Sequence, residues 1–471
     1  MSSDETRKVT LKDMTSEYEI EGRVPLGKAI LLGMQHVLAM FVGNLTPILV
    51  IGGACSLGDA GLMVPVIQNA MLIAGLITLL QLWTVGPIGA RLPCVMGTSS
   101  GFIGVMSGVA GSMGGGVVAY GAILAASFIG GLFEMVLGFF LKPLRRFFPS
   151  VVTAIGLSLI SVGINSFGGG NNNADFGDPV NLLVGFIVLI SIIILKHFAK
   201  GIWSSASILF GIIIGYIVCA IFALIFKTTY VVDGATLTHS WVLQWDKIGQ
   251  AAWISLPKIM PVRFVFSAKA IIPICIMFIV TAVETIGDLS GITEGGMGRE
   301  ATDKELSGGV ACDGIGSTIA SLFGVLPNTS FSQNVGLVGM TRIVNLYCIT
   351  MGAIFLVLCG FCPKLAAIVQ LMPQSVLGGA AVMMFASIVV SGIQLITKEG
   401  IGNREVTIVA VSLGLGYGLG ATANVLAKLP QWVSYVFGGS GIVPAALVAI
   451  ILNICLKKDK KDDPKVVLDA D

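Results

Sequence analysis

The stretch Pro327–Arg342 reads PNTSFSQNVGLVGMTR and interrupts a strongly apolar chain with polar and small residues. It begins with an extended, proline-led segment and continues into the start of a helix rich in small side chains. A second segment of the same kind, Pro93–Gly111, occurs in the first half of the chain. Short or broken spans that line a cavity are where transporters place their binding sites. The sequence therefore predicts two half-helices, each preceded by a short extended strand.

The composition shows what surrounds these two segments. Hydrophobic residues make up 55% of the 471 residues, charged residues only 11%, and the net charge is +2. A soluble chain carries about 25% charged residues, so this chain is expected to be a polytopic membrane protein. It has no basic stripe with interleaved aromatic residues, which argues against nucleic acid as a partner. The N-terminus lacks the features of a secretory signal and is interpreted as a cytosolic tail.

Twelve longer apolar segments are candidates for spanning helices, which need about 20 mostly apolar residues. With the two short segments they give an all-α membrane protein of 14 transmembrane segments. The twelve are Leu26–Val50, Met63–Trp83, Val117–Leu141, Val151–Ile164, Val180–Leu195, Ile208–Phe226, Ala270–Leu289, Val310–Val325, Ile343–Phe361, Leu365–Ile396, Val406–Ala427 and Tyr435–Leu456.

The distribution of lysine and arginine predicts the orientation, because cytosolic loops carry the excess of basic residues. Basic clusters at residues 142–146, at 196–200 and in the C-terminal tail are expected inside. The loop Phe167–Asp178 has no basic residue and is expected outside. The long stretch Lys227–Lys269 also falls outside, although it holds several basic residues. A location in the plasma membrane with both termini in the cytoplasm follows.

Two pairs of similar segments indicate an internal repeat. The segment Phe148–Gly156 resembles Met372–Gly379, and each opens a span after a proline. Leu92-Pro93 with Thr98-Ser99 likewise resembles Leu326-Pro327 with Thr329-Ser330. In each pair the members lie seven spans apart. An odd number of spans per repeat turns the second copy upside down, so the sequence predicts a 7+7 inverted repeat.

Acidic residues inside apolar spans are the first candidates for function. Glu284 and Asp288 are four residues apart and share one face of a helix. Two carboxylates stacked there repel each other, so one must hold a proton or find a donor, which suits coupled proton binding. The alternative is a helix end with Asp288 in interfacial water. His36 and Asp313 are open between a proton role and a structural one.

The half-helices supply a second set of candidates. A helix that begins at the bilayer midplane directs free N–H groups into the cavity, which makes donor rims of Gly97–Gly101 and Ser330–Asn334. Gln333 adds a carboxamide with donor and acceptor sites, as a flat heterocycle requires. Phe331 or Phe102 is a candidate stacking face. The alternative for Gln333-Asn334 is hydrogen bonding between helices.

These motifs resemble those of the nucleobase–ascorbate transporter family. FSQNVGLVGMTR is similar to its signature Gln-Asn-x-Gly-x-x-x-x-Thr-Arg, with Gln333, Asn334, Gly336 and Thr341 in place. Further motifs that look like family landmarks are Gln35-His36, Val283–Asp288, Asp313 and Pro373–Gly379. The resemblance covers nearly the whole chain beyond the N-terminal tail.

The resemblance implies a core domain that holds the substrate and slides against a gate domain, which forms a homodimer. The core would comprise residues 26–147 and 267–362, the gate residues 148–266 and 363–457, and the cytosolic tails residues 1–25 and 458–471. Transport would be proton-coupled, without cofactor or metal. The base would contact Glu284, Gln333, Gly101, Ser332, Asp288, Ser100 and Phe331, while Glu284, His36, Asp313 and Asn334 would support proton coupling.

The branch of the family depends on position 333. Gln333 resembles the xanthine and urate carriers, so the expected activity is proton symport of an oxidised purine base. The alternative is a uracil or other small-anion carrier on the same fold, and sodium coupling stays open. A membrane enzyme is disfavoured because the three histidines are scattered and no H-E-x-x-H or G-x-S-x-G motif occurs. One departure is Ser100-Gly101, where family members often have phenylalanine.

Overall fold

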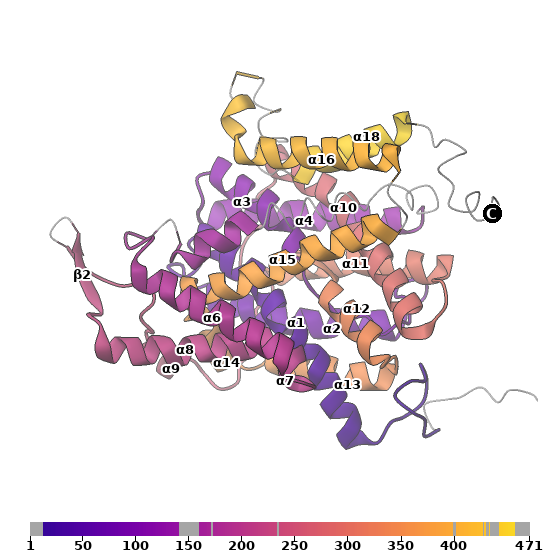
Figure 1. Ribbon diagram of the computed structural model, residues 1–471, viewed down its shortest axis with the longest axis horizontal. Helices are drawn as coiled ribbons and strands as arrows, with labels where there is room; N and C mark the ends of the chain where they lie inside the picture. The colour runs from indigo at the N-terminus through magenta and orange to yellow at the C-terminus, as the bar shows by residue number, and fades with distance from the viewer. Residues whose placement is uncertain are drawn as a thin grey trace, which may run out of the picture.

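The computed structural model describes residues 13–140, 160–170, 173–232, 235–398, 402–426, 428–429, 433 and 442–456. Helices dominate this part of the chain (Figure 1). The elements in chain order are α1 (Leu26–Ala54), α2 (Met63–Leu82), β1 (Met96–Thr98), η1 (Ser100–Phe102), α3 (Ile103–Ser112), α4 (Gly116–Gly138), α6 (Pro179–Phe198), α7 (Ile202–Ser205), α8 (Ser207–Ile225), β2 (Thr229–Val232), β3 (Ala235–Thr238), α9 (Asp246–Gln250), α10 (Ala268–Met297), α11 (Asp303–Leu322), β4 (Asn328–Ser330), α12 (Ser332–Thr341), α13 (Leu346–Cys359), α14 (Pro363–Gln370), α15 (Gln374–Lys398), α16 (Asn403–Ala421), η3 (Ala423–Leu426) and α18 (Ile442–Cys455).

Within these ranges, six helices are long and apolar enough to cross a bilayer, namely α1, α2, α4, α6, α8 and α10. A seventh span results if α13 and α14, which meet at 84°, count as one. The multi-pass, helical prediction is confirmed, while the number of 14 spans stays a prediction. Of the expected span Val151–Ile164, residues 151–159 lie outside the described residues, as does the basic cluster at residues 142–146.

The predicted span Leu365–Ile396 is wrong as one helix. The chain forms α14 up to Gln370 and starts a new helix, α15, at Gln374. Pro373 lies at the break, and a proline inside a helix removes one backbone hydrogen bond and clashes with the preceding turn. The preceding residue is also driven out of the helical region. The apolar run therefore contains a corner, which the composition alone does not show.

The helices pack in two similar groups. Helix α1 contacts α7 and α8, and α10 contacts α18, which pairs with α16. In Figure 1, α16 and α18 lie together at the top, whereas α6 and α8 lie at the lower left. Helix α4 packs mainly on α11 and α10, while α13 packs on α1 and α2. One group thus forms around α1 and the other around α10, which is the corresponding long helix of the second half.

The predicted extended strands form a two-stranded antiparallel sheet in the middle of the fold. Met96 pairs with Ser330, Gly97 with Thr329 and Thr98 with Asn328. The sheet is extended symmetrically, because Ser99 donates to the Pro327 carbonyl (2.8 Å) and Phe331 donates to the Val95 carbonyl (3.1 Å). Each strand leads directly into a short helix, η1–α3 or α12. The prediction of two strand-led half-helices is confirmed.

Two hydroxyl groups support the sheet in the same manner from opposite sides. Thr78 Oγ1 on α2 accepts from the Met96 N–H (2.9 Å) and lies 3.3 Å from the carbonyl of the same residue. Ser317 Oγ on α11 accepts from the Asn328 N–H and donates to its carbonyl, both at 3.0 Å. Met96 and Asn328 each begin their strand. The inverted repeat therefore extends to individual hydrogen bonds.

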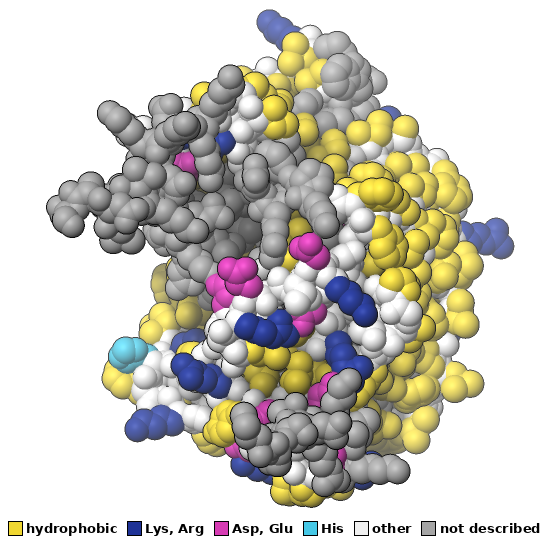
Figure 2. Space-filling model, turned by 90° about the vertical axis from the view of Figure 1, so that its right-hand side faces the viewer, with side chains coloured by type: hydrophobic (Ala, Val, Ile, Leu, Met, Phe, Trp, Pro, Cys, Tyr) yellow, Lys and Arg dark blue, Asp and Glu magenta, His cyan; other side chains and the backbone are white. Residues whose placement is uncertain are grey.

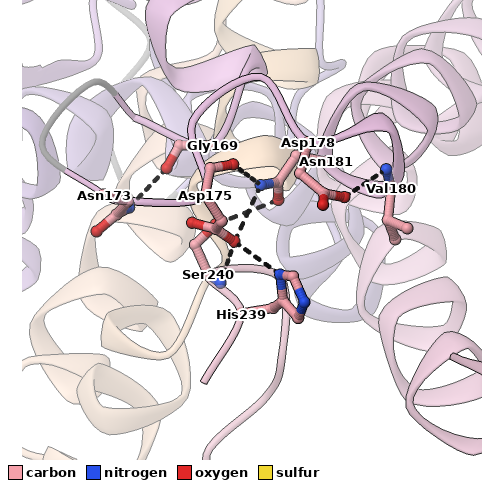
Figure 3. A network of polar contacts seen from close by, with 8 residues as sticks. All are labelled: Gly169, Asn173, Asp175, Asp178, Val180, Asn181, His239 and Ser240. Carbon is pink, nitrogen blue, oxygen red and sulfur yellow. Dashed lines mark hydrogen bonds and ion pairs between the residues drawn. The ribbon is translucent and has the colours of Figure 1, made fainter. Parts of the chain in front are cut away.

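The loops predicted to lie outside are joined to each other. Asp175 Oδ2 accepts from the Ser240 N–H (2.8 Å) and lies 3.3 Å from His239 Nδ1 (Figure 3). Asn181, near the start of α6, donates to the Asp175 carbonyl (3.1 Å). These bonds tie the loop before α6 to the segment after the β2–β3 hairpin. The two loops that the span count places outside are therefore in direct contact, while their side of the membrane stays a prediction.

Part of the predicted N-terminal tail is folded onto the helices. Val344 N–H donates to the Glu17 carbonyl (3.1 Å), and Leu346 N–H donates to the Ile20 carbonyl (3.0 Å). Lys28 Nζ lies 2.6 Å from Glu17 Oε1. Residues 13–24 thus pack against the start of α13.

One face of the molecule carries Lys, Arg, Asp and Glu side chains beside a broad apolar surface (Figure 2), as expected of a membrane protein.

Candidate functional site

A small cavity of about 20 Å³ lies where the two half-helices face α10. That volume holds about one water molecule. Six of the residues predicted to contact a ligand line it, namely Ser100, Gly101, Glu284, Phe331, Ser332 and Gln333. The others are Thr98, Ser99, Thr329, Ser330 and Ile388. Two segments far apart in sequence are thus joined with a carboxyl group in one site.

A larger cavity of about 280 Å³ adjoins the small one, since Ser332, Gln333 and Ile388 border both. Its walls come from α1, α12 and α15, and from the end of α6 with the following residues up to α8. Three serines, Ser204, Ser205 and Ser207, and the exposed Lys196 line it on the side of α6 to α8. A volume of this order approaches that of small-molecule pockets.

Glu284 faces the first half-helix across the small cavity. It is half-buried, and its Oε2 atom has no hydrogen-bond partner among the described residues. A Cβ placed on Gly101 would lie 3.8 Å from that oxygen. An unpaired carboxylate in a water-poor site is costly unless it binds a donor or a proton. Glu284 is therefore available to a ligand, a proton or both.

The other two predicted carboxyl groups are already hydrogen-bonded to hydroxyls. Asp288 Oδ2 accepts from Ser330 Oγ (2.6 Å). Asp313 Oδ2 accepts from Thr285 and from Thr329 (3.1 Å). Asp288 is buried, and α10 continues past it to Met297, so the helix-end alternative is wrong. Both groups connect α10 or α11 to strand β4 and do not line the cavity.

Asn334 and Gln333 have different surroundings although they are adjacent. Asn334 is buried and donates to the His36 carbonyl (3.0 Å), with His36 Nδ1 at 3.2 Å. Gln333 borders both cavities, and its side chain makes no hydrogen bond to any described residue. The interhelical alternative is thus correct for Asn334, which joins α12 to α1. Gln333 presents its carboxamide to the cavities.

The half-helices leave backbone donors uncapped at the cavity. Neither η1 nor α12 has a side-chain cap at its N-terminus. The first amide groups of a helix have no partner within the helix and attract electronegative atoms. Asn334 and Val335 N–H groups both bond the Phe331 carbonyl. The amides of Ser332 and Gln333 come before them and are the donors left for a ligand.

The candidate stacking rings are packed within the protein. Phe102 is 1% exposed, and its ring centroid lies 4.7 Å from that of Phe278. The Phe331 ring lies against Gly43 and Gly97, where added Cβ atoms would be 2.7 Å and 2.6 Å from it. Phe102 therefore offers no free face, and the ring of Phe331 fills the space between α1 and β1.

Sequence reasoning missed Glu134 on α4, which is 1% exposed and accepts from Thr281 Oγ1 (3.0 Å). The signal was present, because Glu134 is the only charged residue of the predicted span Val117–Leu141. It also missed the hydroxyls of Thr285 and Ser330, which hold the carboxyl groups. Hydroxyl residues are common in spans, so their sequence positions carry little signal. In the described part of the chain, no cluster of His, Cys, Asp and Glu could hold a metal ion.

Comparisons with known proteins agree on the type of protein. Residues 27–424 match the model of a permease family. A putative purine permease of Clostridium perfringens is 36% identical over 447 residues, covering 94% of this chain and 93% of its relative. The xanthine permease of Bacillus subtilis is 34% identical (91% and 93%). The uric acid transporter UacT of Escherichia coli is 32% identical (93% and 87%).

Solved structures with the same fold are more distant in sequence. The transmembrane domain of the cyanobacterial bicarbonate transporter BicA has a TM-score of 0.54 at 16% identity, covering 91% of this chain and 97% of that one. SLC26A9 has a TM-score of 0.57 at 12% identity, with 91% and 64% covered. These likenesses show the 7+7 inverted-repeat fold.

Proposed function

We propose that this chain, which belongs to the nucleobase–ascorbate transporter family, carries xanthine or urate across the membrane by proton symport. Membership makes it a nucleobase transporter and not an enzyme. The purine, xanthine and uric acid permeases among its relatives support an oxidised purine as the substrate. A multi-pass position in the plasma membrane, cytoplasmic termini and a homodimer belong to the same proposal.

The observation that carries the proposal is the placing of Glu284 opposite two uncapped half-helices and Gln333. Amide N–H groups donate, a carboxamide does both, and a carboxyl group accepts or, once protonated, donates. An oxidised purine presents alternating N–H and C=O groups along its edges, which such an array can match. Gln333 holds the selectivity position, because its carboxamide can pair with one donor and one acceptor of the base.

Substrate binding requires a change around the small cavity. At about 20 Å³ it admits no purine, whereas the adjoining cavity of about 280 Å³ does. We infer that the base enters through the larger cavity and reaches Glu284 as Ser332 and Gln333 move aside. The larger cavity lies between the predicted core helices α1 and α12 and the predicted gate helices α6, α8 and α15. Sliding at this boundary is the proposed elevator movement.

Proton coupling follows from the chemistry of Glu284. The unpartnered Oε2 favours the neutral form while the site is empty, because an unpaired charge there is unfavourable. A neutral carboxyl group can donate to a carbonyl of the base. Binding of the proton and of the base thereby support each other, which is the thermodynamic condition for symport.

Counterflow uptake of labelled xanthine into proteoliposomes tests the function. Unlabelled urate, guanine, hypoxanthine and uracil serve as competitors, and an uncoupler is added in a parallel accumulation assay. We expect urate to compete and the uncoupler to abolish accumulation. Strong competition by uracil alone would favour the alternative carrier, and an absence of counterflow with every purine would refute the proposal.

The role of Glu284 has a separate test. Glu284→Gln keeps the shape of the side chain but removes its titration, so we expect accumulation to be lost. Glu300→Gln is the matched control, because Glu300 is exposed and lies outside the spans. Full accumulation by Glu284→Gln would overturn the coupling role.

A further inference from the structure

A fourth carboxyl group lies within the helices and is not used by the proposed mechanism. Glu134 is on α4 and is 1% exposed. Helix α4 approaches α11 closely, since a Cβ on Gly131 would lie 2.6 Å from the Gly314 carbonyl. It approaches α10 equally closely, since a Cβ on Gly130 would lie 2.2 Å from the Phe278 ring. Glu134 is thus enclosed by helices that also carry the candidate site.

The hydrogen bonds of Glu134 are too few for a charged group. Its Oε1 atom accepts from Thr281 Oγ1 at 3.0 Å, and its Oε2 atom has no partner in the described residues. The single hydroxyl proton of Thr281 also lies within reach of the Phe278 carbonyl (3.2 Å) and the Met277 carbonyl (3.4 Å). A buried carboxylate normally needs a cation or several donors. This environment favours the neutral acid, whose O–H can donate to a neighbour.

Among the residues that the structure describes, the charged and titratable groups around Glu134 do not offer a cation. Helix α11 contributes Asp313, and α10 contributes Glu284, so both neighbours are acidic. Helix α3 has no titratable side chain, and α1 has only Lys28 at its first turn and the buried His36. Like charges at close range further oppose ionisation. Negative charge on Glu284 or Asp313 therefore works against a second charge on Glu134.

Thr281 connects Glu134 to the candidate site along one helix face. Residues 281, 284, 285 and 288 lie on the same side of α10, because they are spaced three and four apart. Thr281 bonds Glu134 of α4, and one turn later Thr285 bonds Asp313 of α11. Two hydroxyl–carboxyl pairs of the same kind thus adjoin Glu284. The pair of Thr281 and Glu134 has no role in substrate binding or proton coupling in the mechanism proposed above.

We propose that Glu134 is an additional proton-binding site of the transporter, linked to Glu284 through Thr281. The inference rests on the proposed symport. In this symport, the Glu134 carboxylate takes up one proton on one side of the membrane and moves with the helices as the neutral acid. On the other side it releases the proton and becomes a carboxylate again. No bond other than O–H forms or breaks. The number of protons carried with each base is then one greater than Glu284 alone accounts for.

The experiment compares accumulation with exchange in proteoliposomes. Each coupled proton raises the limiting accumulation ratio about tenfold per unit of imposed pH gradient. Glu134→Gln should therefore lower the limiting ratio of labelled xanthine about tenfold at a gradient of one unit. Exchange of labelled for unlabelled xanthine, which needs no net proton movement, should persist. Glu300→Gln is again the matched control.

The possible outcomes separate the inference from the proposed function. An unchanged accumulation ratio in Glu134→Gln would overturn the proton site, whereas an absence of exchange in the unaltered protein would overturn the transport proposal itself. If Glu134→Gln does not fold, Thr281→Val replaces it, since it removes only the hydroxyl link. We expect this variant to shift the pH profile of uptake, and a profile identical to that of the unaltered protein would refute the link.

Discussion

The two strand-led half-helices at the centre are built alike but differ in chemistry. Each strand is supported by one hydroxyl, Thr78 or Ser317, and each leads into a helix without a side-chain cap. The first unit borders the cavity with Thr98–Gly101. The second borders it with Thr329–Gln333 and so adds the carboxamide of Gln333. The repeat thus provides a symmetric frame, and within the described residues only its second unit places a carboxamide side chain at the cavity.

The strands of these units are packed more tightly than the helices that follow them. Gly97 in β1 is enclosed, because an added Cβ would meet the Phe331 ring, Met40 and Asn44 at 2.6–2.9 Å. Gly339 in α12 has no atom within 4 Å of an added Cβ. Gly111 in α3 of the first unit is equally open. The difference therefore separates the enclosed strand from the helices that follow the strands.

Loss of the carboxamide should have the largest effect. Gln333→Ala removes the side chain that distinguishes the units and leaves polar groups of the base unpaired, at about 1–3 kcal/mol. We expect xanthine binding to weaken about 10- to 100-fold, measured by equilibrium binding to purified protein. Gln250→Ala, on an exposed helix end, is the control. Unaltered affinity would mean that the units are equivalent in substrate binding.

Crowding at the first strand should have the next largest effect. Gly97→Ala forces its neighbours apart, and such overpacking typically costs about 1–3 kcal/mol. We expect a lower melting temperature in detergent. Gly339→Ala, at an open position of helix α12, is the control and should leave the melting temperature equal or higher, because alanine favours helices. Equal destabilisation by both changes would contradict the difference in packing.

The hydroxyl supports should have smaller and similar effects. Thr78→Val and Ser317→Ala each leave a buried strand N–H without its acceptor, which costs about 1–2 kcal/mol. We expect nearly equal losses in thermal stability, since the two bonds occupy equivalent positions. Thr236→Val, on the exposed hairpin, serves as the control. A loss confined to one variant would show that the frame is not symmetric.

A change at the rim should have the smallest effect. Gly101→Ala adds a methyl group 3.2 Å from Met277 Cε and 3.8 Å from Glu284 Oε2, so the gap narrows without a severe clash. We expect the competition constant of urate, the bulkier base, to rise about tenfold, the low end for one misplaced methyl group. Xanthine should be affected less. Equal weakening of both bases would assign the rim to affinity and not to selectivity.

Much of the central site could be predicted from the sequence because its signals are local. The proline-led segments gave the two half-helices, and the spacing of Glu284 and Asp288 placed them on one face of α10. The distinct roles of Gln333 and Asn334 were left open, since adjacent residues on a helix face different neighbours and only packing decides which. The family resemblance supplied the substrate class, which spacing alone does not contain.

The rest depends on contacts between distant segments. Residues 13–24 look like a polar tail, yet they bond the start of α13. From the sequence, Asp288 could lie at an exposed helix end or be buried between helices. Its hydrogen bond from Ser330 of strand β4 shows that it is buried. Glu134 was overlooked because a single acidic residue in an apolar span shows no partner until α10 is placed beside it.

The pairing of β1 with β4 also determines the order in which the protein can be assembled. The two strands are encoded in opposite halves of the chain. Until the second half has been synthesised and inserted, β1 has no strand partner for its backbone groups, which are costly to leave unpaired in lipid. Thr78 and Asn44, which bond Met96 and Thr98, are already present in the first half. These side chains thus hold one edge of β1 before and after β4 arrives, and the site becomes complete only when β4 has been inserted.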